Sequence, residues 1–76
     1  MFRKISIEYC VEWNYLPKAA SLADAIEAEY GIKPDLIKSG GGVFEVEVDG
    51  DLVFSKKAQF RFPENQEIIN ILKARK

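Results

Sequence analysis

The segment from Val43 to Ser55 constrains the fold more than any other part of this chain, because it has the pattern of a β-hairpin. Residues 43–48 alternate between apolar and acidic side chains over most of their length, as in a strand with one buried face. Asp49 and Gly50 follow, and this dipeptide strongly favours a two-residue turn. Residues 52–55 supply the returning strand. The sequence therefore predicts an antiparallel strand pair.

The residues before this hairpin predict a strand followed by a helix. Residues 4–9 alternate between polar and apolar side chains, and residues 14–31 carry apolar side chains at three- and four-residue intervals. We expect Asn14 to cap the helix, because Pro17 is then tolerated in the first turn. Gly31 is the expected C-terminal stop.

Shorter elements complete the chain. Residues 32–38 predict a short strand, and Pro34 assigns it to the edge of the sheet. A glycine-rich break at residues 39–42 leads into the hairpin. Residues 56–62 are expected to form a loop, and a second helix opens at residues 63–65.

The predicted order is strand, helix, strand, strand, strand, helix. The first three elements form a βαβ unit, so their strands are expected to be parallel with a right-handed crossover. Both helices can cover one face of the sheet and leave the other face comparatively polar. We therefore expect a single domain over residues 1–76, an α/β two-layer sandwich with a four-stranded mixed sheet and two helices on one face.

The composition argues against several classes of function. The net charge of -1 disfavours general nucleic-acid binding, which needs clustered lysine and arginine. Without histidine there is no Cys-His dyad or His-Cys metal site, and the acidic residues lack metal-loop spacing, so no metal site is expected. No apolar run reaches membrane-spanning length and no secretory signal is recognised, so a reducing, cytoplasmic setting is expected.

Cys10 is the only cysteine, and it lies where the first strand gives way to the helix. The positive end of a helix dipole favours the thiolate form of such a residue. Three residues further on, where a redox motif carries its second sulfur, this sequence has Trp13. A single cysteine excludes an intramolecular disulfide.

Other residues are expected at the same end of the sheet. If the strand at 43–48 runs antiparallel beside the first strand, Gly42 and Val43 neighbour the end of the strand that carries Cys10. The returning strand brings further polar residues to that edge, and its cations would lower the pKa of Cys10 and attract anions, while Glu12 would oppose them. These residues are Ser55, Lys56, Lys57 and, in the following loop, Arg61.

Each of these residues also has a structural interpretation. A buried cysteine often serves as a small hydrophobic side chain, and Lys56 and Lys57 can simply keep an edge strand soluble. The glycines at 40–42 form a turn without the Gly-Lys-Ser/Thr sequence of a phosphate-binding loop. Trp13 is either a core aromatic, a lid on the thiol or an exposed anchor for a partner.

Taken together, these segments resemble the selenoprotein W-related (Rdx) family of small thioredoxin-like domains, over nearly the whole chain. The family's reactive motif is Cys-x-x-Cys or Cys-x-x-selenocysteine between the first strand and the first helix. Cys10 matches its first position, and Trp13 stands at the second. The resemblance rests on Tyr9-Cys10, the helix at 14–31, Gly41-Gly42-Val43-Phe44-Glu45-Val46, Asp49-Gly50, Ser55-Lys56-Lys57 and Arg61-Phe62-Pro63.

The resemblance implies a redox role, with glutathione or protein thiols and disulfides as partners. One hypothesis is a monothiol oxidoreductase in which Cys10 is released from a mixed disulfide by an external thiol. Glutathione would then be a co-substrate, and no resident cofactor is expected. The alternative is a non-catalytic interaction module with a patch of Cys10, Trp13, Phe60 and Phe62. The expected oligomeric state is a monomer or a weak homodimer, and whether the protein is an enzyme stays open.

Overall fold

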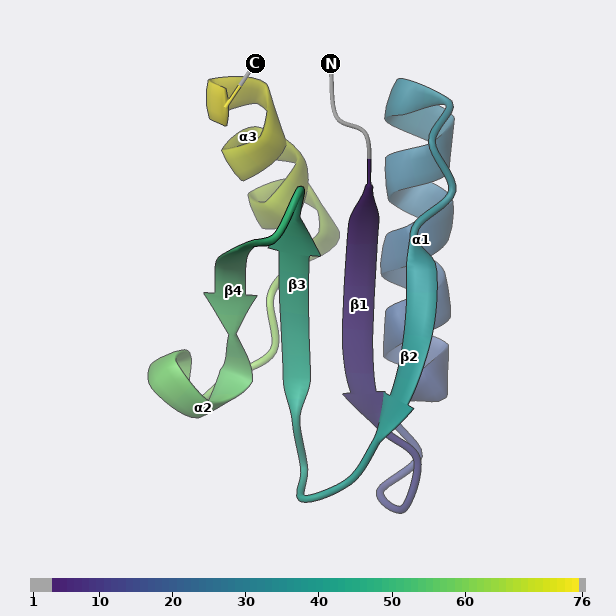
Figure 1. The fold of residues 1–76 in the computed structure, drawn as a ribbon, viewed down its shortest axis with the longest axis vertical. Helices are drawn as coiled ribbons and strands as arrows, with labels where there is room; N and C mark the ends of the chain where they lie inside the picture. The colour runs from purple at the N-terminus through teal and green to yellow at the C-terminus, as the bar shows by residue number, and fades with distance from the viewer. Residues whose placement is uncertain (1–3, 76) are drawn as a thin grey trace.

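A mixed sheet forms one layer of the molecule and two long helices form the other (Figure 1). The structure, a computed structural model, describes residues 4–75. The strands lie in the order β2-β1-β3-β4, with β1 parallel to β2 and antiparallel to β3. The elements are β1 (Ile5–Cys10), α1 (Leu16–Tyr30), β2 (Asp35–Ser39), β3 (Phe44–Val48), β4 (Asp51–Ser55), α2 (Lys56–Gln59) and α3 (Asn65–Arg75). The predicted α/β sandwich with a thioredoxin-like arrangement is confirmed.

The start of α1 differs from the sequence prediction. Tyr15, and not Asn14, takes the N-cap position, and its side chain makes no capping hydrogen bond. Asn14 has a φ of 58°, a left-handed conformation that asparagine tolerates better than most residues. Pro17 lies in the first turn as expected, and Gly31 ends the helix with a φ of 70°. Asn14, which could have capped the helix, thus forms part of the turn that precedes it.

The strand β2 begins three residues later than predicted. Its pairing with β1 starts where Asp35 meets Ser6, immediately after Pro34. Proline has no N–H to donate to a ladder, which explains why the strand does not extend back to Ile32. The prediction that this strand lies at an edge of the sheet is confirmed.

The hairpin between β3 and β4 has the predicted two-residue turn. Asp49 and Gly50 have φ values of 51° and 89°, the paired positive values of a type I′ turn. Further along, the register shifts between Val46 and Glu47, so that Phe54 faces the first and Leu52 the second. This irregularity is a β-bulge, which bends β4 relative to β3.

The segment at 56–62, predicted as a loop, contains the short helix α2. Lys56, Ala58 and their neighbours favour helix, but a single turn is too short to show a periodic apolar pattern. Phe60 closes it in a left-handed conformation, with a φ of 57°, and its N–H donates to the carbonyl of Lys56 at 2.6 Å.

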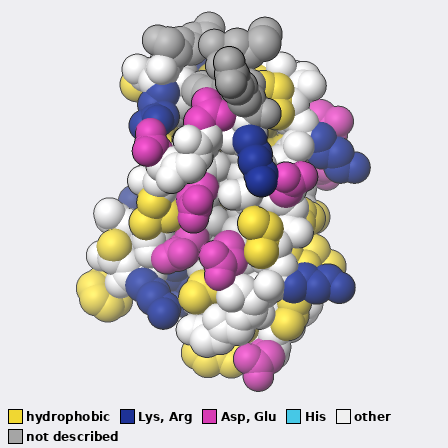
Figure 2. Space-filling model, viewed as in Figure 1, with side chains coloured by type: hydrophobic (Ala, Val, Ile, Leu, Met, Phe, Trp, Pro, Cys, Tyr) yellow, Lys and Arg dark blue, Asp and Glu magenta, His cyan; other side chains and the backbone are white. Residues whose placement is uncertain are grey.

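The two faces of the sheet differ in chemistry. The face toward α1 and α3 is a continuous apolar core, built from alternate residues of β1 and β3. The opposite face carries half-buried acidic side chains, and Figure 2 shows acidic groups gathered near its middle. No helix within residues 4–75 is long and apolar enough to cross a bilayer. The main core side chains are Ile5, Ile7, Tyr9, Leu22, Ile26, Phe44, Val46, Val48, Ile68, Ile69 and Leu72.

Candidate functional site

Cys10 is the last residue of β1, and its side chain is completely buried. Its N–H donates to the carbonyl of Val43 at 2.9 Å, and its own carbonyl accepts from the N–H of Tyr15 at 3.2 Å. These bonds tie the backbone of Cys10 both to the segment before β3 and to the start of α1. Gly42 and Val43 therefore lie beside the end of β1, as the sequence analysis expected.

The turn at residues 11–14 follows Cys10 and packs onto the glycine-rich segment. The ring of Trp13 lies so close to Gly42 that a Cβ atom added there would sit 2.5 Å from Cζ3 of the indole. Gly42 also has a φ of 73°, so glycine is required at this position both by conformation and by space. Trp13 is nevertheless 62% exposed, because only part of its ring rests on this backbone.

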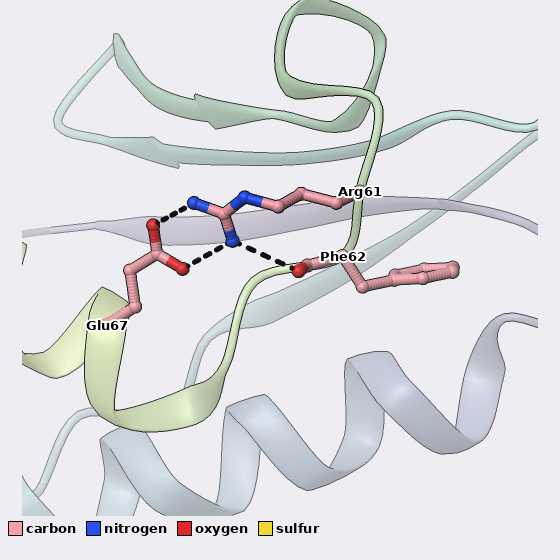
Figure 3. Close-up of polar contacts among 3 residues, drawn as sticks. All are labelled: Arg61, Phe62 and Glu67. Atoms are coloured by element: carbon pink, nitrogen blue, oxygen red, sulfur yellow. Dashed lines mark hydrogen bonds and ion pairs between the residues drawn. The ribbon is translucent and has the colours of Figure 1, made fainter.

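The cations expected at this end of the sheet have different surroundings. The ammonium group of Lys56 lies 5.7 Å from the ring centroid of Tyr15, next to the start of α1. Lys57 is exposed on α2. Arg61 makes two hydrogen bonds to the carboxylate of Glu67, at 2.7 and 2.6 Å (Figure 3). The charge of Arg61 is therefore paired with a carboxylate of α3.

The ion pair between Arg61 and Glu67 changes the titration of both groups. The side-chain hydrogen bond from Arg61 is the main reason that the pKa of Glu67 is lowered, and the same bond raises the pKa of Arg61. Arg61 also donates to the carbonyl of Phe62 at 3.3 Å. Arg61 thus holds the segment before α3 in place.

Ser55 lies level with the middle of β1 rather than with its end. It pairs with Glu45, which in turn pairs with Glu8, two residues before Cys10. The Ser55 hydroxyl donates to Oε2 of Glu45 at 3.0 Å. The side chain of Ser55 is therefore engaged by a carboxylate of the neighbouring strand.

A row of four aromatic rings leads from the surface to the core at this end of the sheet. Each ring meets the next nearly edge to face, with centroids 6.1, 4.6 and 5.3 Å apart. This is a favourable geometry for aromatic pairs. The row could not be predicted from the sequence, because its members come from three separate segments and share no regular spacing. We call it the aromatic row; its members, in order, are Trp13, Tyr15, Phe62 and Phe44.

Among residues 4–75, no group of three or more cysteine or acidic side chains is arranged to hold a metal ion. The candidate site thus consists of one enclosed thiol, a glycine-rich backbone segment, an exposed indole and the ammonium group of Lys56 beside Tyr15. This combination, at the junction of the first strand and first helix, is that of a thioredoxin-like domain with a single cysteine.

The chain belongs to the Rdx family, because the family model matches residues 4–74. Migration and invasion enhancer 1 from Bos taurus is 34% identical over 71 residues, which cover 92% of this chain and 62% of the relative. The Mus musculus protein of the same name is 34% identical over 70 residues, covering 91% and 61%. The chain thus spans somewhat less than two thirds of these relatives.

Two solved structures share the fold. A selenoprotein W-related protein from Vibrio cholerae superposes with a TM-score of 0.80 and 25% identity, covering 86% of this chain and 85% of the other. A protein from Bordetella parapertussis superposes with a TM-score of 0.93 over the full length of both chains, at 23% identity. The second comparison concerns the fold alone. Both support a thioredoxin-like fold for this chain.

Proposed function

We propose that the protein is a redox protein that acts through Cys10 alone, by thiol–disulfide exchange linked to glutathione or to protein thiols. The observation that carries this proposal is the position of Cys10 at the end of β1, directly before α1, in an Rdx domain. This is the first position of the family's reactive motif. A reducing, cytoplasmic compartment would suit such chemistry.

The exchange needs two steps and an external thiol. The Cys10 thiolate attacks a disulfide, a new S–S bond joins it to one half, and the other half leaves as a thiolate. An external thiol then attacks the substrate-derived sulfur of this mixed disulfide, so that Cys10 leaves as a thiolate and the external thiol is joined to that half of the substrate. Because Trp13 supplies no second sulfur, no residue of the same chain can release Cys10 from the mixed disulfide. A second external thiol cleaves the released disulfide in solution, so that overall the substrate disulfide is reduced to two thiols and two external thiols are joined as one disulfide.

Burial of Cys10 adds a requirement for movement. Because Cys10 is completely buried, a disulfide can reach its sulfur only after a local opening, and we expect the turn at residues 11–14, which rests on Gly42, to be the segment that moves. Lys56 and Lys57 would then attract the carboxylates of glutathione, and the backbone at Gly42 and Val43 would line the approach. Ser55 and Arg61 are further candidates for this binding surface, although each is already held by a carboxylate.

Intact mass spectrometry after incubation with oxidised glutathione tests this proposal. The parent protein is expected to gain one glutathione per chain, and Cys10→Ser is expected to gain none. The adduct should form faster in Trp13→Ala, because the ring that covers Gly42 is removed. A parent protein that stays unmodified in native buffer, yet is modified after unfolding in urea, would contradict the proposal.

A non-catalytic interaction module is the second candidate function. Two observations favour it: the sulfur is fully enclosed, while Trp13 is 62% exposed and Phe60 is 89% exposed. It predicts that Cys10→Ser leaves the binding of a partner intact and that Trp13→Ala weakens it. The opposite pattern would favour the redox function.

A further inference from the structure

A groove on the helical side of the molecule takes no part in the chemistry proposed for Cys10. It lies where the first turns of α1 meet the segment that leads into α3, and its volume is about 230 Å³. Leu22, Phe44 and Phe62 contribute apolar walls together with two prolines. Its polar lining comes from Lys18, Ser21 and Asn65.

The size of the groove suits one large side chain. A cavity of about 150 Å³ with apolar walls is enough to hold benzene, whereas sites for small-molecule ligands usually exceed about 300 Å³. At about 230 Å³, this groove has room for one aromatic ring and little else. The rings of Phe44 and Phe62 would offer such a ring the edge-to-face contacts that aromatic pairs favour.

Lys18 lines the groove and Lys56 lies beside its Phe62 wall, although the whole chain is slightly acidic and Glu64 is exposed between the lining residues Pro63 and Asn65. The ammonium groups of Lys18 and Lys56 lie 4.7 and 5.6 Å from the centroid of Phe62. Among the described residues 4–75, neither lysine has a carboxylate within ion-pair distance. The N-terminus of α3, with its partial positive charge, lies at the same rim because Asn65 begins that helix.

The walls of the groove are held in place by polar contacts. Arg61 bonds both to Glu67 and to the carbonyl of Phe62, and Figure 3 shows the Phe62 ring directed away from that ion pair. On the other side, the amide of Asn65 donates to the hydroxyl of Ser21 at 3.0 Å, which joins α3 to α1. A groove ordered in advance loses little conformational entropy when it is filled.

We propose that this groove binds an acidic segment of a partner protein, with one aromatic side chain seated in the groove against the walls formed by Phe44 and Phe62. Carboxylates on either side of that residue would face Lys18 and Lys56. A buried aromatic anchor is a usual source of affinity in such contacts, and charges at the rim contribute mainly to specificity and association rate. This binding does not depend on the sulfur of Cys10.

The test uses an acetylated, amidated peptide with one phenylalanine between two pairs of aspartates, titrated into ¹⁵N-labelled protein. The amide signals of Ser21, Leu22 and Asn65 are expected to shift most. Binding should be lost when the phenylalanine is replaced by alanine or the aspartates by lysines. Because the groove is separate from the thiol, Cys10→Ser should bind as the parent does.

Two variants test the groove itself. Lys18→Glu is expected to weaken binding about fivefold or more, the size expected for a reversed exposed charge. It should fold normally, because glutamate is favoured in the first turn of a helix. Ser21→Phe should block binding by filling the groove. Lys33→Glu, an equal charge change in the exposed segment before β2, should leave binding unchanged.

Several results would overturn the proposal. One is the absence of signal shifts at a peptide concentration of about 1 mM, the weak end of specific binding. Others are equal binding of the lysine-flanked peptide, or shifts confined to β3 and β4. Binding of N-acetylphenylalanine as tight as that of the peptide would assign the groove to a small carboxylate instead of a protein segment.

Discussion

At the scale of single residues, the contact between Trp13 and Gly42 is the feature that we expect to control access to Cys10. The N–H of Val11 donates to the carbonyl of Ser39 at 3.1 Å, which holds the turn that carries Trp13 beside the glycine-rich segment, and Cys10 just before this turn is completely buried. Gly42 is the only part of the glycine-rich segment that this indole touches so closely. A neighbouring glycine, Gly41, has nearly the same φ, 69°, but open space where its Cβ would be.

This difference gives a matched pair of variants. Gly41→Ala is expected to cost about 1–2 kcal/mol of stability, from left-handed backbone strain alone. Gly42→Ala should cost more, and it should also displace the indole, because the new methyl group would overlap Cζ3. Fluorescence of Trp13, the only tryptophan in the chain, reports the displacement, and alkylation by iodoacetamide reports access to Cys10.

The expected outcome is a shifted emission spectrum and faster alkylation for Gly42→Ala only. Equal spectra and equal alkylation rates for the two variants would show that Trp13 does not restrict the thiol.

At the scale of secondary-structure elements, the strands and long helices could be predicted from sequence because each carries its own pattern. Alternation defined β1 and β3, and the Asp49-Gly50 turn fixed how β4 returns. The errors fall where one residue has competing roles: Asn14 suits a helix cap and also a left-handed turn, and the second role prevails. The single turn of α2 is too short to leave a pattern.

The candidate site was only partly predictable for a different reason. Pairing of β1 with β3 correctly indicated that Gly42 and Val43 lie beside Cys10. The burial of Cys10 and the pairing of Arg61 with Glu67 depend on the path of loops, which no local pattern specifies. The aromatic row could not be predicted either, because the contacts between its rings also depend on the path of loops.

The end of α2 provides a prediction at this scale. Phe60 is 89% exposed and adopts a left-handed conformation, so it carries backbone strain with little burial in return. Phe60→Asn is expected to raise the free energy of unfolding by about 0.5–1 kcal/mol, because asparagine accepts this conformation more readily. Urea denaturation measures the change.

Phe60→Leu is the control, since it removes the ring but keeps the strain, and it should leave stability nearly unchanged. If Phe60→Asn destabilised the protein as much as a core substitution, the ring would have to pack on a surface that it does not contact here.

At the scale of the whole molecule, the ion pair between Arg61 and Glu67 joins the segment after β4 to α3, and so connects the edge of the sheet with the helical layer. The pKa of Glu67 is lower in the folded protein than in the unfolded chain. A lowered carboxylate pKa stabilises the fold at pH values above the unfolded pKa. That stabilisation is lost as the pH falls through the lower, folded pKa.

Glu67→Gln is therefore expected to be less stable than the parent at pH 7. The difference should shrink below about pH 4, where an ordinary glutamate becomes protonated. Thermal unfolding of both proteins between pH 3 and pH 7 measures it. Glu29→Gln, which removes a looser pair with Lys73 at 4.0 Å, is the control and should have a smaller effect at pH 7. A constant difference at every pH would exclude the ion pair as its source.

The position of β1 in the middle of the sheet also has a consequence for the order in which the protein can fold as it is synthesised. This strand emerges from the ribosome before both of its neighbours: one of its edges is covered by β2 and the other only by β3, which ends at Val48. Until then, a nascent chain carries an apolar strand with an open hydrogen-bonding edge, the type of surface that chaperones shield and that aggregates form upon.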